Sequence, residues 1–422
     1  MAQKISKGSF GEPATDRPRV SRAQKTREVQ EAITASALEL LAAFGVDGLA
    51  LTKIAAHAGM SNGPLYGRYD SAEDVALELW EEKLRDHYKR LILEFNAFAS
   101  SKDLEPSQWL LQELEAPSAL TAAAVEIVAV ARRFPLLVDS VRDEVEALFQ
   151  HICAAHPDIP PAICSLRLTV PTGCVLKSRS VPKTRPPWKA ILLQFRESAL
   201  DPKNLDQQGL SASPVSLSIP TPDTGDVGLD EFVSAVMEVV ARVGFEKTTA
   251  HRVARAAGHS FSSAYTHVGT KDELMHMAIG QMMDQIWRTG TASFLELGPE
   301  EYKNAIIALQ IGLLAESNRP IRQLRTETTV AMRHHTDLAA AGRKRTAASL
   351  AIVSDAVEKT YPDAAAAAAA FWYLTAASGI GTVSLSLLTD AFRNLDWTPV
   401  AAVAYEMAFA TTIEPLSKLS KA

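Results

Sequence analysis

The chain has 422 residues, of which 47% are hydrophobic and 22% charged, a composition that excludes a disordered protein and gives room for two or three domains. Its net charge of −6 excludes a generally basic nucleic-acid coat, so any charge that binds DNA must be local. Three cysteines without metal-ligand spacing and an N-terminus without an apolar signal core lead us to expect a cytoplasmic protein with reduced, buried thiols.

Residues 1–25 are interpreted as a basic flexible arm. Residues 1–30 carry seven lysines and arginines against three acidic residues, and Arg27 is the last of the basic ones. A solvated tail and an arm that follows DNA phosphates or the minor groove both fit this charge, and the elements that follow decide which is favoured.

A helix-turn-helix is predicted next. Helical spacing of apolar residues predicts a first helix, which Gly45 ends; its apolar face comprises Ile33, Ala37, Leu40, Leu41 and Phe44 within Thr26–Phe44. A short helix over Leu51–Ala58 ends at Gly59, because glycine tolerates the left-handed backbone that stops a helix. Ser61 is a good N-cap for a third helix that runs to about Tyr69.

The third helix has the outward residues of a DNA reader. An amide, an apolar edge and a cation suit the major groove better than a protein core, as supplied by Asn62, Pro64, Tyr66, Gly67 and Arg68. The run GMSNG (59–63) also matches the G-x-S-x-G of hydrolase nucleophile elbows. An elbow needs a buried strand before the serine, whereas an amphipathic helix is expected here, so we expect no enzyme.

Helical periodicity continues through the chain and predicts an all-α fold. Ser71 can cap a long fourth helix that runs to about Phe98. Further helices are expected at 106–114, 119–134, 136–155, 161–175 and 187–200. Residues 202–228 are rich in Pro, Ser, Gly and Asp, which indicates a flexible linker.

After the linker the chain repeats itself. At an offset of 199 residues, 33–75 aligns with 232–274 without a gap. The identical pairs are Glu39/Glu238, Ala42/Ala241, Gly45/Gly244, Ala55/Ala254, Ala58/Ala257, Gly59/Gly258, Ser61/Ser260 and Tyr66/Tyr265. The ends of the halves correspond too, 156–176 to 361–383 and 185–195 to 396–409, so each half is interpreted as one module.

Three other features receive plainer interpretations. Residues 364–389 carry no charge, but their alanines, hydroxyl residues and two glycines indicate a helix packed on other helices, so no membrane contact is expected. His334 and His335 are adjacent on a predicted helix and point in different directions, so no metal site is expected there. Arg322 and Arg325, with Glu327 nearby, either bind an acidic ligand or form a solvated face.

These motifs resemble the TetR family of transcriptional regulators, in residues 33–75 and again in 232–274. The resemblance rests on the glycine after the first helix, the Ile/Val-Ala-x-x-Ala-Gly run, the tyrosine of the third helix and the acidic start of the fourth. It implies, in each half, a three-helix DNA-binding head, a helical ligand-binding body and pairing through the last two helices.

The resemblance also implies roles for single residues. Tyr66 and Tyr265 would contact the DNA backbone or a thymine, Thr249 would cap a helix, and Lys271 would hold a phosphate. The residues expected to bind DNA are Arg27, Thr52, Ser61, Asn62, Pro64, Tyr66, Gly67 and Arg68, then Thr249, Ser260, Phe261, Ser263, Tyr265, Thr266, His267 and Lys271. The residues expected to line an effector pocket are Phe95, Trp109, Trp287, Tyr302, Arg325 and Trp372.

Both halves depart from the family pattern. The first has Ala50 and Ala72 where threonine and lysine are usual, and the second has Ser262 and Ala264 where the first has glycine and leucine. Equal participation of the two heads is therefore open. A ligand-binding or protein-interaction module with degenerate DNA binding stays as the alternative function.

The sequence thus predicts two fused TetR-like modules that form an intramolecular pseudo-dimer, with a four-helix bundle of 161–175, 187–200, 363–388 and 399–413. The expected domains are the arm (1–25), first head (26–71), first body (72–201), linker (202–228), second head (229–270) and second body (271–414). The expected function is a ligand-responsive repressor that reads an asymmetric or pseudo-palindromic double-stranded operator. Its partners would be DNA and an unidentified small-molecule effector; a further homodimer stays open, and no cofactor or metal is expected.

Overall fold

The computed structural model describes residues 22–182, 187–207, 210, 212–260, 270–290, 299–360 and 365–409. Every regular element within these ranges is helical, which confirms the predicted all-α class.

The first half contains the predicted helices, with bounds that differ from the expected ones by up to about four residues. They are α1 (Arg22–Phe44), η1 (Val46–Gly48), α2 (Leu51–His57), α3 (Gly63–Tyr66), α4 (Ala72–Leu79), η2 (Trp80–Leu84), α5 (Arg85–Ala99), α6 (Gln108–Glu115), α7 (Ala119–Val130), η3 (Ala131–Arg133), α8 (Val138–Ala155), α9 (Pro161–Lys177), α10 (Trp188–Ala199) and α11 (Pro202–Leu205). Residues 22–25 belong to α1 rather than to the arm.

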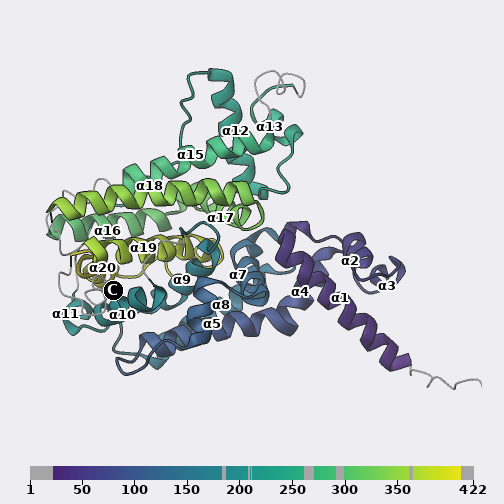
Figure 1. Cartoon of the computed structure of the whole chain (residues 1–422), viewed down its shortest axis with the longest axis horizontal. Helices are drawn as coiled ribbons and strands as arrows, with labels where there is room; N and C mark the ends of the chain where they lie inside the picture. Colours follow the sequence, from purple (N-terminus) through teal and green to yellow (C-terminus); the bar gives the residue numbers. More distant parts are fainter. Residues whose placement is uncertain are drawn as a thin grey trace, which may run out of the picture.

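The second half begins after the linker. Its elements are α12 (Val227–Val243), α13 (Ala250–Ala256), α15 (Lys271–Gly290), α16 (Pro299–Leu314), η5 (Glu316–Asn318), α17 (Arg319–His334), α18 (Thr336–Thr360), α19 (Ala365–Leu385) and α20 (Thr398–Phe409). In Figure 1 the first head, α1 to α4 in purple, lies at the right and the second head, with α12 and α13, lies at the top. The other helices of the two halves lie side by side.

The predicted fourth helix is one continuous run made of α4, η2 and α5. The Ser71 hydroxyl accepts from the amides of Glu73 and Asp74 at 3.2 and 3.4 Å, and the Asp74 carboxylate accepts from the Ser71 amide at 2.7 Å. This reciprocal cap starts the helix where the sequence predicts it. Between α4 and α5 the residues of η2 form a π-helical turn that keeps Trp80 and Leu84 buried.

Helices α9 and α19 cross at unusually short range. A side chain carbon at Gly173 would lie 1.7 Å from the carbonyl oxygen of Ala377, and one at Gly381 would lie 1.8 Å from that of Thr169. Only glycine permits such an approach of two helix backbones. Gly381 follows Gly173 by 208 residues and Ala377 follows Thr169 by the same 208, so each contact is the equivalent of the other.

Helices α10 and α20 lie beside this crossing, and both contact α19. The side chain amide of Gln194 on α10 donates to the carbonyl of Met407 on α20 at 2.9 Å, in a buried position. One hydrophobic core runs continuously through the first half and into α16, α19 and α20. A second core joins α12, α13 and α15 to α17.

The linker is docked on the second half, which corrects the expectation of a free flexible tether. The Val215 amide donates to the Ala308 carbonyl at 3.1 Å, and the Leu217 amide donates to the Asn318 side chain at 3.2 Å. Gly312 leaves room for this part of the linker, because a side chain carbon there would lie 2.4 Å from the Val215 carbonyl oxygen. These contacts hold the linker against α16 and η5.

Within the described residues, no single helix is long and apolar enough to cross a membrane. One pair of helices, Gln108–Glu115 with Ala119–Arg133, meets the length and composition limits together but is bent by 61°.

Candidate nucleic-acid interface

The first head is built around the turn between α2 and α3. Gly59 has a φ of 66°, in the region that favours glycine, and the next amide, of Met60, donates to the Ala55 carbonyl at 3.0 Å. Ile54 on α2 and Leu65 on α3 have no exposed surface, so these two side chains fix the two short helices on the core of the head. This is the helix-turn-helix that the sequence predicts.

Three local expectations for this head were wrong. Ser61 does not cap α3: the capping position belongs to Asn62, which makes no side-chain cap bond, and α3 ends at Tyr66 rather than at Tyr69. The cause is the run of glycine and proline around α3, which supports a single turn and little more. Phe44, the last residue of α1, is 54% exposed, so it does not belong to the buried apolar face of that helix.

The outward face of α3 carries the predicted reading residues. Ser61, Asn62, Pro64, Tyr66, Gly67 and Arg68 are all exposed. Tyr66 is 57% exposed, which leaves its ring open to a partner. Thr52 on α2 and Arg27 on α1 are exposed as well.

Arg68 is less available than the sequence suggested, since one of its guanidinium nitrogens donates to the side chain oxygen of Gln30 on α1 at 2.7 Å. Gln30 also donates to Tyr69 at 2.8 Å and to Glu78 on α4, and the Tyr69 hydroxyl donates to Glu78 at 3.0 Å. Burial, followed by the Glu78 charge, raises the pKa of Tyr69, so it stays a neutral donor.

This polar network ties the end of the reading segment to α1 and α4, and sequence reasoning missed it. The signal was present: Tyr69 falls on the inward side of the predicted third helix, where a buried hydroxyl requires a partner. At the offset of 199 residues, the second head has Leu229, Val268 and Met277 in place of Gln30, Tyr69 and Glu78. The second head cannot make the same network, so the two heads differ in support as well as in reading residues.

The second head is described in part. Thr249 caps α13, accepting from the Arg252 amide at 3.4 Å, whereas its counterpart Ala50 makes no side-chain cap on α2. Ser260 is exposed, and Lys271 is the first residue of α15. The other predicted reading residues, Phe261, Ser263, Tyr265, Thr266 and His267, lie outside the described residues, as does the side chain of Lys271.

The residues predicted to line an effector pocket lie on several helices of both halves. Phe95 is fully buried with its ring 6.1 Å from that of Phe195, and Trp109 carries the Arg90 guanidinium 4.0 Å from its ring. Tyr302 lies on α16, and Trp372 lies on α19.

The remaining two pocket residues lie on other helices. Arg325 is half-buried on α17, where desolvation lowers its pKa to about 10. Trp287 belongs to α15, and its side chain lies outside the described residues.

Neither interpretation of the arginines on α17 fits Arg322 and Glu327. Arg322 has no exposed surface and donates to the carbonyls of Leu313 and Ala315 at 2.6 and 2.8 Å, so it fastens α17 to the end of α16. Glu327 is 1% exposed and pairs with arginines of the first half. Both are structural rather than solvated. Cys164 and Cys174 are buried as expected, and Cys153 is half-buried.

A comparison with known proteins supports the family predicted for the first head. Residues 33–79, from α1 to the end of α4, match the family model described as bacterial regulatory proteins, tetR family. A search of curated proteins gives no match. The match supports a DNA-binding transcriptional regulator of the TetR type.

Proposed function

We propose that this protein is a sequence-specific transcriptional regulator that reads DNA bases with residues 61–68. The observation that carries the proposal is the outward face of α3, where Asn62, Pro64 and Tyr66 stand exposed on a head of the TetR type. An amide, an apolar edge and a phenol on one helical turn offer the hydrogen bonds and apolar contacts that discriminate base pairs in the major groove. Exposed Arg27 supplies a cation for phosphates beside the reading turn.

We further propose that one chain supplies two unlike heads, arranged as an intramolecular pseudo-dimer. The equivalent contacts of Gly173 with Ala377 and of Gly381 with Thr169 support it, because an isologous interface has residue i on j and j on i. The core shared between the halves supports it too. Heads of a two-fold arrangement meet successive major grooves about 34–36 Å apart. Since the heads carry different reading residues, the preferred operator is asymmetric.

Regulation by a small molecule that binds in the helical bodies completes the proposal. A ligand that prefers one placement of the heads shifts the population toward it and changes the affinity for DNA. We propose that the protein is a repressor, so that effector binding releases it from the operator.

The test begins with DNA selected from a random pool, or with the protein's own upstream region, in a fluorescence anisotropy titration. Tyr66→Ala should weaken binding at least tenfold, and Asn62→Ala should relax base preference at one position. Lys271→Ala should weaken all sequences alike and reduce the salt slope by about one unit. Glu39→Ala, on the exposed side of α1 and 69% exposed, is the matched control and should leave affinity unchanged.

An interaction module with degenerate DNA binding makes the opposite forecast. It would show no selected sequence, and the same weak, salt-sensitive binding for Tyr66→Ala, Glu39→Ala and the parent chain. That result would overturn the proposed function.

A further inference from the structure

The helices that support the two heads carry one charged pattern twice. A glutamate is followed six and seven positions later by two basic residues, as Glu126, Arg132 and Arg133 in the first half and as Glu327, Arg333 and His334 in the second. Each glutamate pairs with the basic residues of the other half. We call Glu327 with Arg132 and Arg133 the second-head clamp, and Glu126 with Arg333 and His334 the first-head clamp.

The second-head clamp closes on the last turn of α12. Glu327 accepts from Arg132 at 2.6 Å, and its carboxylate forms an ion pair with Arg133, 2.8 Å from the Nε. The same arginines donate to the carbonyls of Ala241 and Val243, both at 3.0 Å. The final carbonyls of a helix have no partner within it and carry a partial negative charge, so arginines from the first half cap the first helix of the second head.

The first-head clamp makes the equivalent contacts at the end of α1. His334 Nε2 lies 2.6 Å from a Glu126 carboxylate oxygen, and His334 Nδ1 lies 3.2 Å from the Ala43 carbonyl. The other Glu126 oxygen accepts from the Val46 amide at 3.2 Å, and Arg333 approaches the carboxylate at 3.3 Å. A side chain from the second half therefore caps the first helix of the first head.

The glycine that ends each of these helices admits the clamp. Gly45 and Gly244 have φ values of 73° and 85°. A side chain carbon at Gly45 would lie 2.5 Å from Glu126 Oε1, and one at Gly244 would lie 2.9 Å from the Arg133 guanidinium. Gly45 and Gly244 are identical in the repeat because each position requires both a left-handed backbone and space for a close charged neighbour.

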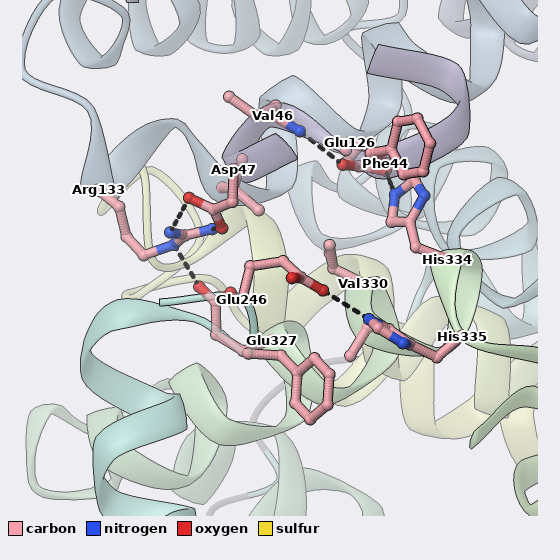
Figure 2. Close-up of a pocket in the computed structure, with 14 residues that line it drawn as sticks. Phe44, Val46, Asp47, Glu126, Arg133, Glu246, Glu327, Val330, His334 and His335 are labelled. Atoms are coloured by element: carbon pink, nitrogen blue, oxygen red, sulfur yellow. Dashed lines mark hydrogen bonds and ion pairs between the residues drawn. The ribbon is translucent and has the colours of Figure 1, made fainter. Parts of the chain in front are cut away.

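The clamps form one buried cluster between the heads. The six side chains are each at most 10% exposed. Asp47 of the first head joins them, 2.7 Å from Arg133 and 3.1 Å from Lys247 of the second head. The cluster borders a pocket with a cavity of about 20 Å³, room for one water molecule but not for an effector. Figure 2 shows Arg133 and His334 on opposite sides of it, the first turned to Asp47 and the second to Glu126.

We propose that the clamps position the heads and that they are unequal, because His334 occupies in one the place that Arg133 occupies in the other. Both ring nitrogens of His334 face oxygens that only accept, so both contacts form together only when each nitrogen carries a proton. A guanidinium is charged at every working pH. The hold on the first head therefore depends on a second ring proton, which an imidazole can lose as the pH rises, whereas the hold on the second head does not depend on such a proton.

The charged and titratable groups around His334 come from every neighbouring element. They are Glu126 on α7, Asp47 after α1, Arg133 on η3, Glu246 after α12, Glu327 and Arg333 on α17, and His335 just after it. Two of them require separate treatment. His335 pairs with Glu246 of the second half at 2.6 Å rather than with Glu126, so it serves as an internal control. Burial raises the pKa of Glu327, and its ionisation at higher pH strengthens the second-head clamp, which is the opposite sign.

Amide hydrogen exchange of the full chain without DNA tests this at about pH 6 and pH 8, after correction for the intrinsic exchange rate. Peptides over 41–48 should lose protection about tenfold at the higher pH, the effect of losing one charge-assisted bond, while peptides over 237–244, which end before Glu246, should not. His334→Arg should keep 41–48 protected at both pH values. His334→Gln should leave it less protected at both, without a pH effect, and His335→Gln should behave as the parent chain.

Equal change in both peptides, or a pH effect that survives in His334→Arg, would overturn the proposal. If His334→Arg fails to fold, Glu126→Gln provides the second route, since it should also abolish the pH effect at 41–48. The consequence for an operator rests on the proposed function, but this measurement uses no DNA. If amide exchange follows the prediction but the protein selects no DNA sequence, the proposal on the clamps is supported and only the proposed function is refuted.

Discussion

The crossing of α9 and α19 makes a sharp prediction because one helix offers both the test and its control. Gly381 and Gly379 lie two residues apart on α19, and both have helical backbones. An added methyl at Gly381 would lie 1.8 Å from the Thr169 carbonyl oxygen, whereas at Gly379 its nearest neighbour is an Arg325 nitrogen at 3.7 Å, an ordinary contact.

The two substitutions should therefore have opposite signs. Gly379→Ala should stabilise the protein by up to about 1 kcal/mol, since alanine is the better helix former. Gly381→Ala gains the same intrinsic term, but the helices must separate by about 1.5 Å to reach van der Waals distance, which loosens contacts along the seam. Overpacking of this kind costs about 1–3 kcal/mol, and a rigid backbone neighbour places it at the upper end, so a net loss of about 2 kcal/mol is expected.

Urea unfolding monitored by circular dichroism and by tryptophan fluorescence measures the difference, with two probes because a chain of this size need not unfold in one step. The midpoint of Gly381→Ala should fall below that of the parent chain, and the midpoint of Gly379→Ala should not. Equal midpoints for the two variants would show that α9 and α19 do not meet at these residues in solution.

Two further predictions concern Lys177 and the helix caps. Desolvation, followed by the Arg325 charge, lowers the pKa of Lys177 to about 8, so the unfolded chain binds more protons between about pH 8 and 10.5 and stability rises with pH across that window. Lys177→Met should stabilise the protein by about 3 kcal/mol at pH 7, a difference that shrinks to nothing near pH 10.5. Lys189→Met, at a side chain that is 54% exposed, should change the stability little. Urea midpoints at pH 7 and 10 measure both effects. Ala50→Thr should add the cap that α2 lacks and Thr249→Ala should remove that of α13, with changes of about 1 kcal/mol in opposite directions, seen as slower and faster amide exchange in the two helices.

Much of the fold can be predicted from the sequence, because nearby residues determine where the helices form and end. The apolar spacing of α8, α9 and α10 identifies helices whose ends fall within two residues of the expected ones, because glycine, proline and capping residues mark them. The Ser71 cap was predicted for the same reason. The length of α3 was overestimated, because the apolar spacing of a helix continues over glycine and proline residues that do not sustain a longer helix.

The remainder depends on partners distant in sequence. His334 and Glu126 are 208 residues apart, and no pattern around either residue shows that they pair. The linker has the composition of a free tether, yet Asn318, 101 residues beyond Leu217, holds its backbone. Arg68 has the chemistry of a base reader, but its contact with Gln30 depends on how α1 lies against α3. The sequence shows the chemical type of a side chain, whereas packing against distant residues determines whether that side chain is free to bind a partner.

Hydroxyl-radical footprinting of the complex, with native mass spectrometry of the same sample, tests the central claim that one chain carries two unlike DNA-reading heads. We predict one chain per operator and two protected patches about 10 base pairs apart on one face of the DNA. Tyr66→Ala should erase one patch and Tyr265→Ala the other. Two chains on every operator, or a single patch that Tyr66→Ala leaves intact, would contradict it.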